Sequence, residues 1–188
     1  MEALEIATGA NPSSAVIWLH GLGADGHDFA PIVPELGLPV GMEVRFIFPH
    51  APLLPVTINN GHVMPAWYDV RSQDLRQIED ETGIRASQQR VEALIRREEA
   101  RGIPAARIVL AGFSQGGAVA LHSGLRHAEP LAGVLALSTY LPLPHTLASE
   151  ASMANSGIPI LMAHGSADNV IPIAQGLASR DWLEKSGH

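Results

Sequence analysis

The chain alternates short apolar runs with longer amphipathic stretches. Several short runs, such as residues 108–111 and 160–163, are apolar without alternation, which is typical of strands covered on both faces. The amphipathic stretches repeat their apolar residues at helical spacing, as residues 84–95 do. Strands are therefore predicted at Leu4–Thr8, Ala15–Leu19, Glu43–Phe48, Arg107–Gly112, Gly133–Ser138 and Pro159–His164.

Four helical segments lie among these strands. The longest includes Ile84 to Ile95 and is ended by Gly102-Ile103-Pro104. The others are predicted at Gln115–His127, at Ile173–Lys185 and, interrupted by prolines, at Phe29–Leu36. This alternation predicts one α/β domain over residues 1–188, with a mainly parallel, doubly wound sheet.

One long connection, from Pro49 to Pro65, is rich in proline. It is expected to be an irregular loop. Long loops inside compact domains often line a functional site, and a rigid surface segment is the alternative.

Composition narrows the classes of function. The chain has 188 residues, of which 46% are apolar and 16% charged, which indicates a globular domain. A net charge of −7 without a basic stripe argues against a nucleic-acid partner and an anionic membrane. The absence of cysteine excludes disulfides, thiolate metal sites and cysteine nucleophiles. No apolar stretch reaches about 18 residues, so no membrane span is expected. The first residues do not resemble a signal peptide, so a cytoplasmic location is expected.

The strongest chemical signal is the run Gly-Phe-Ser-Gln-Gly at residues 112–116, which fits G-x-S-x-G. An apolar predicted strand leads into it and a helix of small residues leaves it, which is the context of a nucleophile elbow. Such a turn would project the Ser114 hydroxyl from the sheet edge. The start of the helix would let the Gln115 amide bind an oxyanion. The alternative is that Ser114 is an ordinary N-cap.

A glycine-rich turn after the second predicted strand is the candidate for the rest of the oxyanion hole. Residues 19–23 read Leu-His-Gly-Leu-Gly, and a loop after an early strand supplies the second amide in this architecture. The Leu22 amide is the candidate donor, and His20 is expected to shape the loop rather than act as a base. Taken alone, the pattern could equally be a plain strand-to-helix turn.

Asp168 is the candidate acid. It closes the run His-Gly-Ser-Ala-Asp at residues 164–168, directly after a late predicted strand, and it follows Ser114 in chain order as a triad acid should. Its role would be to hold a histidine in one tautomer and to stabilise the histidine cation. A capping aspartate at the next helix is the alternative.

Four motifs together resemble a known family. The runs at residues 19–29, 66–69, 112–117 and 164–168 are similar to those of the carboxylesterase and acyl-protein thioesterase (phospholipase/carboxylesterase) family. The similarity is greatest to the bacterial carboxylesterases. It extends over the whole chain, with the motifs in order and at family-like spacing.

The resemblance implies an α/β-hydrolase fold and cleavage of small-molecule carboxylic esters or thioesters, usually of short to medium acyl chains, without a cofactor. It implies Ser114 as the nucleophile, Asp168 as the acid, and Leu22 and Gln115 as oxyanion donors. The segment at residues 138–142 resembles the border of the family's acyl-binding groove. Leu22 and Tyr140 are therefore expected to contact the substrate.

The family pattern breaks at the triad histidine, which would follow one more strand. After Asp168 the only histidine is His188, behind the predicted helix at residues 173–185. That helix would carry the chain roughly 20 Å away, whereas a base must reach within about 3 Å of Ser114. The sequence thus predicts a C-terminally truncated α/β-hydrolase that lacks the last strand, the C-terminal helix and the triad histidine. No pair of the other histidines has the sequence spacing, together with a carboxylate, that is typical of a metal site, so no metal is expected.

Three functions stay open. The first is an esterase whose histidine comes from residues outside this chain or from a partner, because loss of one triad member leaves only about 10³- to 10⁴-fold rate enhancement over water. The second is a catalytically inactive relic that binds acyl ligands or a partner. The third is an assembly role: residues 159–164 would form an edge strand, which predicts a homodimer or a swapped assembly through that edge.

Overall fold

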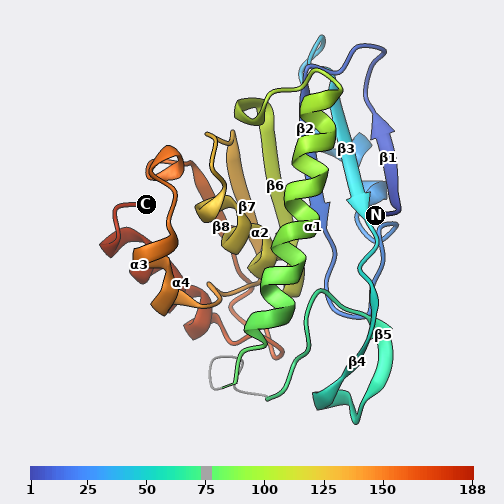
Figure 1. Cartoon of the computed structure of the whole chain (residues 1–188). Coiled ribbons are helices and arrows are strands. Elements are labelled where there is room, and N and C mark those ends of the chain that lie inside the picture. Colours follow the sequence, from blue (N-terminus) through green and yellow to red (C-terminus); the bar gives the residue numbers. More distant parts are fainter. Residues whose placement is uncertain (73–77) are drawn as a thin grey trace.

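The computed structural model describes residues 1–72 and 78–188, and its centre is a six-stranded sheet in the order β1-β3-β2-β6-β7-β8 (Figure 1). In this sheet β1 is antiparallel to β3, and the other neighbours are parallel. All six predicted strands are confirmed to within one residue at each end. They are β1 (Ala3–Ala7), β2 (Ser14–Leu19), β3 (Val44–Pro49), β6 (Ile108–Phe113), β7 (Gly133–Leu137) and β8 (Ile160–Ala163).

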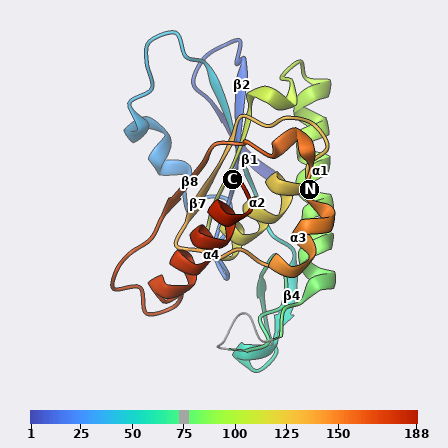
Figure 2. The ribbon, with the colours of Figure 1, turned by 90° about the vertical axis from the view of Figure 1, so that its left-hand side faces the viewer.

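The sheet is covered on both faces, because successive side chains of a strand point to opposite sides. In β2, Ile17 and Leu19 join the core beneath the α-helices, whereas Trp18 joins a second core beneath a 3-10 helix, η1 (Ala30–Leu36). Figure 2 shows η1 and the α-helices on opposite sides of the sheet. The helices are α1 (Glu81–Ala100), α2 (Gln115–Arg126), α3 (Pro144–Glu150) and α4 (Ile173–Lys185). This is the α/β-hydrolase arrangement that the sequence predicts.

Two helical segments differ from expectation. The segment at Phe29–Leu36 is helical but of the 3-10 type, with Pro34 inside it. A proline nitrogen cannot donate the hydrogen bond that an α-helix needs. Helix α3 was not predicted; it has seven residues, of which Leu147 is buried.

The connection at residues 49–65 is not an irregular loop. It forms an antiparallel ribbon of β4 (Leu53–Val56) and β5 (His62–Pro65) around a 3-10 turn, η2 (Thr57–Asn59). Asn60 and Gly61 turn the chain back with φ of 55° and 74°. The ribbon projects beyond the carboxyl ends of the parallel strands (Figure 1).

A buried carboxylate ties α1 to the sheet. Glu98 is fully buried and accepts hydrogen bonds from Arg45 of β3 at 2.7 Å, from Arg101 at 3.0 Å and from Arg97 at 3.2 Å. A buried charge is tolerated only when it is paired in this way. This cluster therefore fixes α1 over the edge of the sheet near β3.

Strand β8 is an outer strand of the described sheet, and its residues alternate between half-buried and exposed. Leu161 is 65% exposed. None of the helices in the described part of the chain combines the length and the apolar character needed to cross a bilayer.

Candidate active site

Ser114 lies in a strained turn between β6 and α2. Its φ of 53° and ψ of −120° form a conformation that non-glycine residues rarely adopt. The end of β7 and the residues after it hold Ser114 in this conformation. The Ser114 amide donates to Leu137 O at 2.9 Å, and Thr139 Oγ1 donates to Ser114 O at 2.7 Å. The Ser114 side chain makes no capping hydrogen bond to α2. The turn thus has the backbone of a nucleophile elbow rather than that of an N-cap.

Two glycines make this turn possible. A Cβ atom on Gly112 would lie 2.3 Å from the carbonyl of Gly116. A Cβ atom on Gly116 would lie 2.3 Å from Leu19 O, at the end of β2. The G-x-S-x-G spacing is therefore a packing requirement, since the strand, the helix and the neighbouring strand end meet here without side chains between them.

The loop after β2 passes directly beside the serine. A Cβ atom on Gly21 would lie 3.6 Å from Ser114 Cβ. His20 anchors this loop: it is buried, its Nε2 accepts from the Ala51 amide at 3.0 Å, and its Nδ1 lies 2.7 Å from Gly21 O. These partners assign the ring proton to Nδ1, and burial lowers the pKa of His20. His20 is thus a neutral, structural residue, in keeping with the role expected of it.

Gln115 connects the elbow to the segment at residues 66–69. Its Oε1 accepts from the Trp67 amide at 2.8 Å, and its Nε2 donates to Tyr68 O at 2.7 Å. The Trp67 indole in turn donates to His20 O at 2.9 Å. Because Gln115 is the first residue of α2, its amide belongs to the first turn, where backbone donors lack intrahelical partners.

Asp168 forms the turn after β8. Its Oδ1 accepts from the amides of Ile171 at 2.9 Å and Val170 at 2.8 Å, and these bonds, with the charge of His164, lower its pKa. His164 Nε2 lies 3.6 Å from Asp168 Oδ2 and 2.7 Å from Ile171 O. A Cβ atom on Gly176 would lie 2.6 Å from His164 Nδ1, so α4 packs against this ring. His164 therefore holds the Asp168 turn in place.

A cavity of about 570 Å³ brings four of the five predicted site residues together, and Asp168 is not part of its lining. Leu22, Ser114, Gln115 and Tyr140 all line it. Sequence reasoning did not single out the remaining lining residues, although the proline-rich connection did point to the ribbon that supplies two of them. These further residues are Ile58, Asn59, Tyr68, Val70, Asn169, Val170, Ile171, Pro172 and Gln175.

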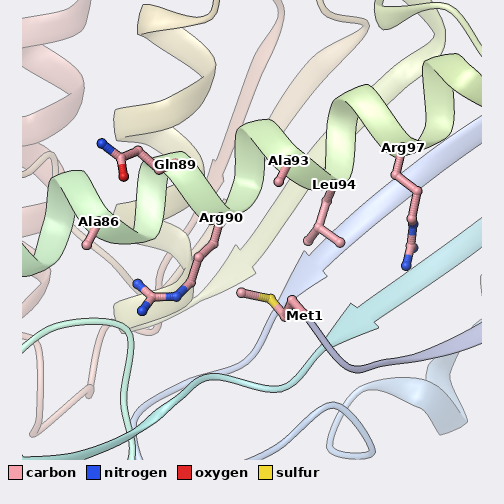
Figure 3. Close-up of a pocket in the computed structure, with 7 residues that line it drawn as sticks. All are labelled: Met1, Ala86, Gln89, Arg90, Ala93, Leu94 and Arg97. Carbon is pink, nitrogen blue, oxygen red and sulfur yellow. The ribbon is translucent and has the colours of Figure 1, made fainter.

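Polar and apolar groups share this cavity. The Tyr140 hydroxyl lies 2.9 Å from the Tyr68 hydroxyl, and burial raises the pKa of Tyr68 well above its ordinary value. Asn169 to Pro172 bring the Asp168 turn to the rim. A second hollow, of about 400 Å³ along α1, has no serine, histidine or carboxylate in its lining (Figure 3). The chemistry therefore points to the cavity at Ser114.

No histidine lines this cavity in the described part of the chain. His122 Nε2 lies 3.1 Å from Gln88 Oε1, and His127 Nδ1 lies 2.9 Å from Glu92 Oε2. His188 lines a separate hollow beside β8. The structure thus lines one cavity with the predicted nucleophile and oxyanion donors, while neither Asp168 nor any of the described histidines contributes to that lining.

The fold and the elbow define an α/β-hydrolase of the serine type. The profile of the Phospholipase/Carboxylesterase family matches residues 1–188, and the chain belongs to that family. Acyl-protein thioesterase 1 of Neurospora crassa is 45% identical over 187 residues, which cover 95% of this chain and 76% of that protein. Acyl-protein thioesterase 1 of Cryptococcus neoformans is 39% identical over 192 residues, covering 100% of this chain and 80% of that protein.

Solved structures agree with this assignment. Arabidopsis thaliana SOBER1 superposes with a TM-score of 0.87 at 32% identity, covering 93% of this chain and 84% of that one. Zea mays acyl-protein thioesterase 2 superposes with a TM-score of 0.83 at 29% identity, covering 99% of this chain and 86% of that one.

Proposed function

We propose that this chain carries the nucleophile and the acid of a Ser-His-Asp hydrolase that cleaves carboxylic esters and thioesters of short to medium acyl chains. One observation carries the proposal: Ser114 is held in a strained elbow and opens into the same cavity as Leu22 and Gln115. Strain of this kind costs about 1–3 kcal/mol and collects at functional sites.

In the proposed reaction, Ser114 Oγ attacks the acyl carbonyl carbon while its proton passes to a histidine base. The amides of Leu22 and Gln115 bind the oxyanion that forms. The intermediate collapses to the acyl-enzyme, and the alcohol or thiol leaves with the proton. Water then attacks the acyl-enzyme, which releases the carboxylic acid and restores Ser114. Asp168 would hold the histidine in the productive tautomer.

The proposal includes both ester classes, and two observations favour thioesters. Three of the four similar proteins reported above are named acyl-protein thioesterases. A thiol of pKa about 8.5 is also a far better leaving group than an alcohol, so its departure depends less on protonation by a histidine. A site without a histidine at Ser114 is therefore expected to retain more activity on a thioester than on the matching oxygen ester.

A second candidate function rests on the cavity lining, which has no described histidine. In that case the chain is an inactive relic that binds acyl ligands in the same cavity or self-associates through β8. The proposed homodimer would pair β8 edges, and Leu161→Lys would then shift gel filtration from dimer to monomer. For either function the proposed location remains the cytoplasm.

A fluorophosphonate probe with intact-mass measurement tests the proposed function. Labelling is expected in the unmodified chain and in Ser166→Ala, which removes an exposed serine at the same sheet edge, and is expected to vanish in Ser114→Ala. Added imidazole should accelerate labelling by acting as the base. A chain that stays unlabelled even with imidazole would refute the esterase mechanism and favour the relic.

A further inference from the structure

A cluster of three residues that could ligate a metal begins three residues after Leu22, and neither the proposed reaction nor the sequence prediction gives it a role. Asp25, His27 and His50 each offer one ligand atom, and these atoms lie within 4.8 Å of one another. His27 Nδ1 is 3.0 Å from Asp25 Oδ1, and the two imidazole rings are 5.4 Å apart between centroids. The three residues follow the carboxyl ends of β2 and β3, which are neighbours in the sheet.

We propose that Asp25, His27 and His50 bind a divalent transition-metal cation of the Zn²⁺ class where the loop that carries Leu22 meets the end of β3. Two imidazoles and one carboxylate are donors that suit Zn²⁺, Cu²⁺, Ni²⁺ or Fe²⁺, whereas Mg²⁺ and Ca²⁺ prefer oxygen ligands alone. Ligation at about 2.0–2.2 Å requires the donor atoms to close in further. The side chains of Asp25 and His27 are 55% and 69% exposed, so they are free to turn inward.

The backbone around the cluster holds the two segments in place. The Gly26 amide donates to His50 Nδ1 at 3.2 Å, and the His27 amide donates to Asp25 Oδ1 at 2.7 Å. A Cβ atom on Gly26 would lie 2.3 Å from Phe48 O, so this turn lies flat against the end of β3. The donors thus sit on fixed backbone rather than on two independent loops.

Binding would alter the loop. A neutral imidazole has a single nitrogen lone pair, and that of His50 faces the Gly26 amide. The same lone pair cannot accept from Gly26 and ligate a cation, so a bound cation detaches Gly26 from His50. Gly26 lies four residues after Leu22, and we infer that occupancy loosens the Leu22 side of the oxyanion hole. This consequence rests on the proposed function, whereas the binding itself does not.

Titration with Zn²⁺ against a competing indicator dye, and with Co²⁺ followed by visible absorption, tests the site. We expect one strong equivalent in the unmodified chain. Asp25→Asn and His27→Asn should each weaken binding by about tenfold or more. Asp25→Asn keeps an oxygen for the His27 amide, so the turn survives. His62→Asn, which removes an exposed histidine outside the cluster, should bind as the unmodified chain does. Equal binding by all four proteins, or none, would overturn the site.

The effect on the loop has its own readout. Saturating Zn²⁺ should slow fluorophosphonate labelling of Ser114 in the unmodified chain and in His62→Asn, but not in His27→Asn. Unchanged labelling in a chain that demonstrably binds Zn²⁺ would overturn the link to the oxyanion loop. Failure to label even without metal would count against the proposed hydrolase, and the titration would still decide the cation site.

Discussion

Gly116→Ala is the substitution for which the structure makes the sharpest prediction. The added methyl carbon would lie 2.3 Å from Leu19 O, 2.5 Å from His20 O and 2.6 Å from Leu19 C. Ordinary contact between such atoms is about 3.5 Å, so α2 and the end of β2 must separate by roughly 1 Å. All three obstacles are backbone atoms, which cannot turn aside as the end of a side chain can. The separation also moves the loop that carries Leu22 away from Ser114.

Overpacking of a core costs about 1–3 kcal/mol, and a clash with backbone belongs at the upper end of that range. We therefore expect Gly116→Ala to lose about 3 kcal/mol, which corresponds to a Tm about 6 to 12 °C lower for a domain of this size. Urea unfolding followed by circular dichroism measures the loss. Fluorophosphonate labelling at a temperature where the variant is folded measures the damage to the site.

Gly157→Ala is the matched control, because a Cβ atom there meets nothing within 4 Å and the residue is exposed. It should unfold within about 0.5 kcal/mol of the unmodified chain. If Gly116→Ala were as stable as Gly157→Ala and labelled as fast as the unmodified chain, the close contact between elbow and oxyanion loop would be wrong.

Two further predictions concern buried ionisable groups. Glu98→Ala should lower the free energy of unfolding by about 3 kcal/mol, because it leaves Arg45 without its buried partner. Urea unfolding measures this loss. The control Glu99→Ala, on the same helix, should change the free energy of unfolding by less than about 0.5 kcal/mol. Burial, with the charges of Arg126 and Arg85, lowers the pKa of His122 to about 3. The unfolded chain takes up that proton near pH 6.5 and the folded chain does not, so stability should fall from pH 6.5 downward by up to about 1.4 kcal/mol per pH unit. His122→Gln should flatten this slope in pH-dependent thermal unfolding, whereas exposed His145→Gln should leave it as it is; an unchanged slope in His122→Gln would contradict a neutral, buried ring.

The strands and the elbow were predictable because their information is local. Each strand is a short, mostly apolar run between turn residues, and G-x-S-x-G encodes its own packing through two glycines. The ribbon at residues 53–65 was missed because proline is rare in sheets, yet this two-stranded ribbon accepts Pro55 and Pro65. Helix α3 was missed because it is short and starts from Leu143 in a left-handed conformation that its sequence does not announce.

The cluster of Asp25, His27 and His50 was missed for a different reason. Spacing rules look for ligands within one segment, whereas His50 lies 23 residues after His27 in the chain. The two come together because β2 and β3 are parallel neighbours whose carboxyl ends meet. Strand order, which the sequence pattern alone does not supply, was therefore the missing information.

The backbone of Ser114 also bears on how this chain evolves. A glycine at position 114 would relieve strain of about 1–3 kcal/mol at this φ of 53°, which exceeds the entropic cost of glycine of about 0.5–1 kcal/mol, so Ser114→Gly is expected to make the domain more stable. Serine therefore occupies this position against a thermodynamic bias toward glycine. A chain that did not use the hydroxyl would gain stability from that replacement, so comparing this position among related sequences would show whether selection keeps the serine.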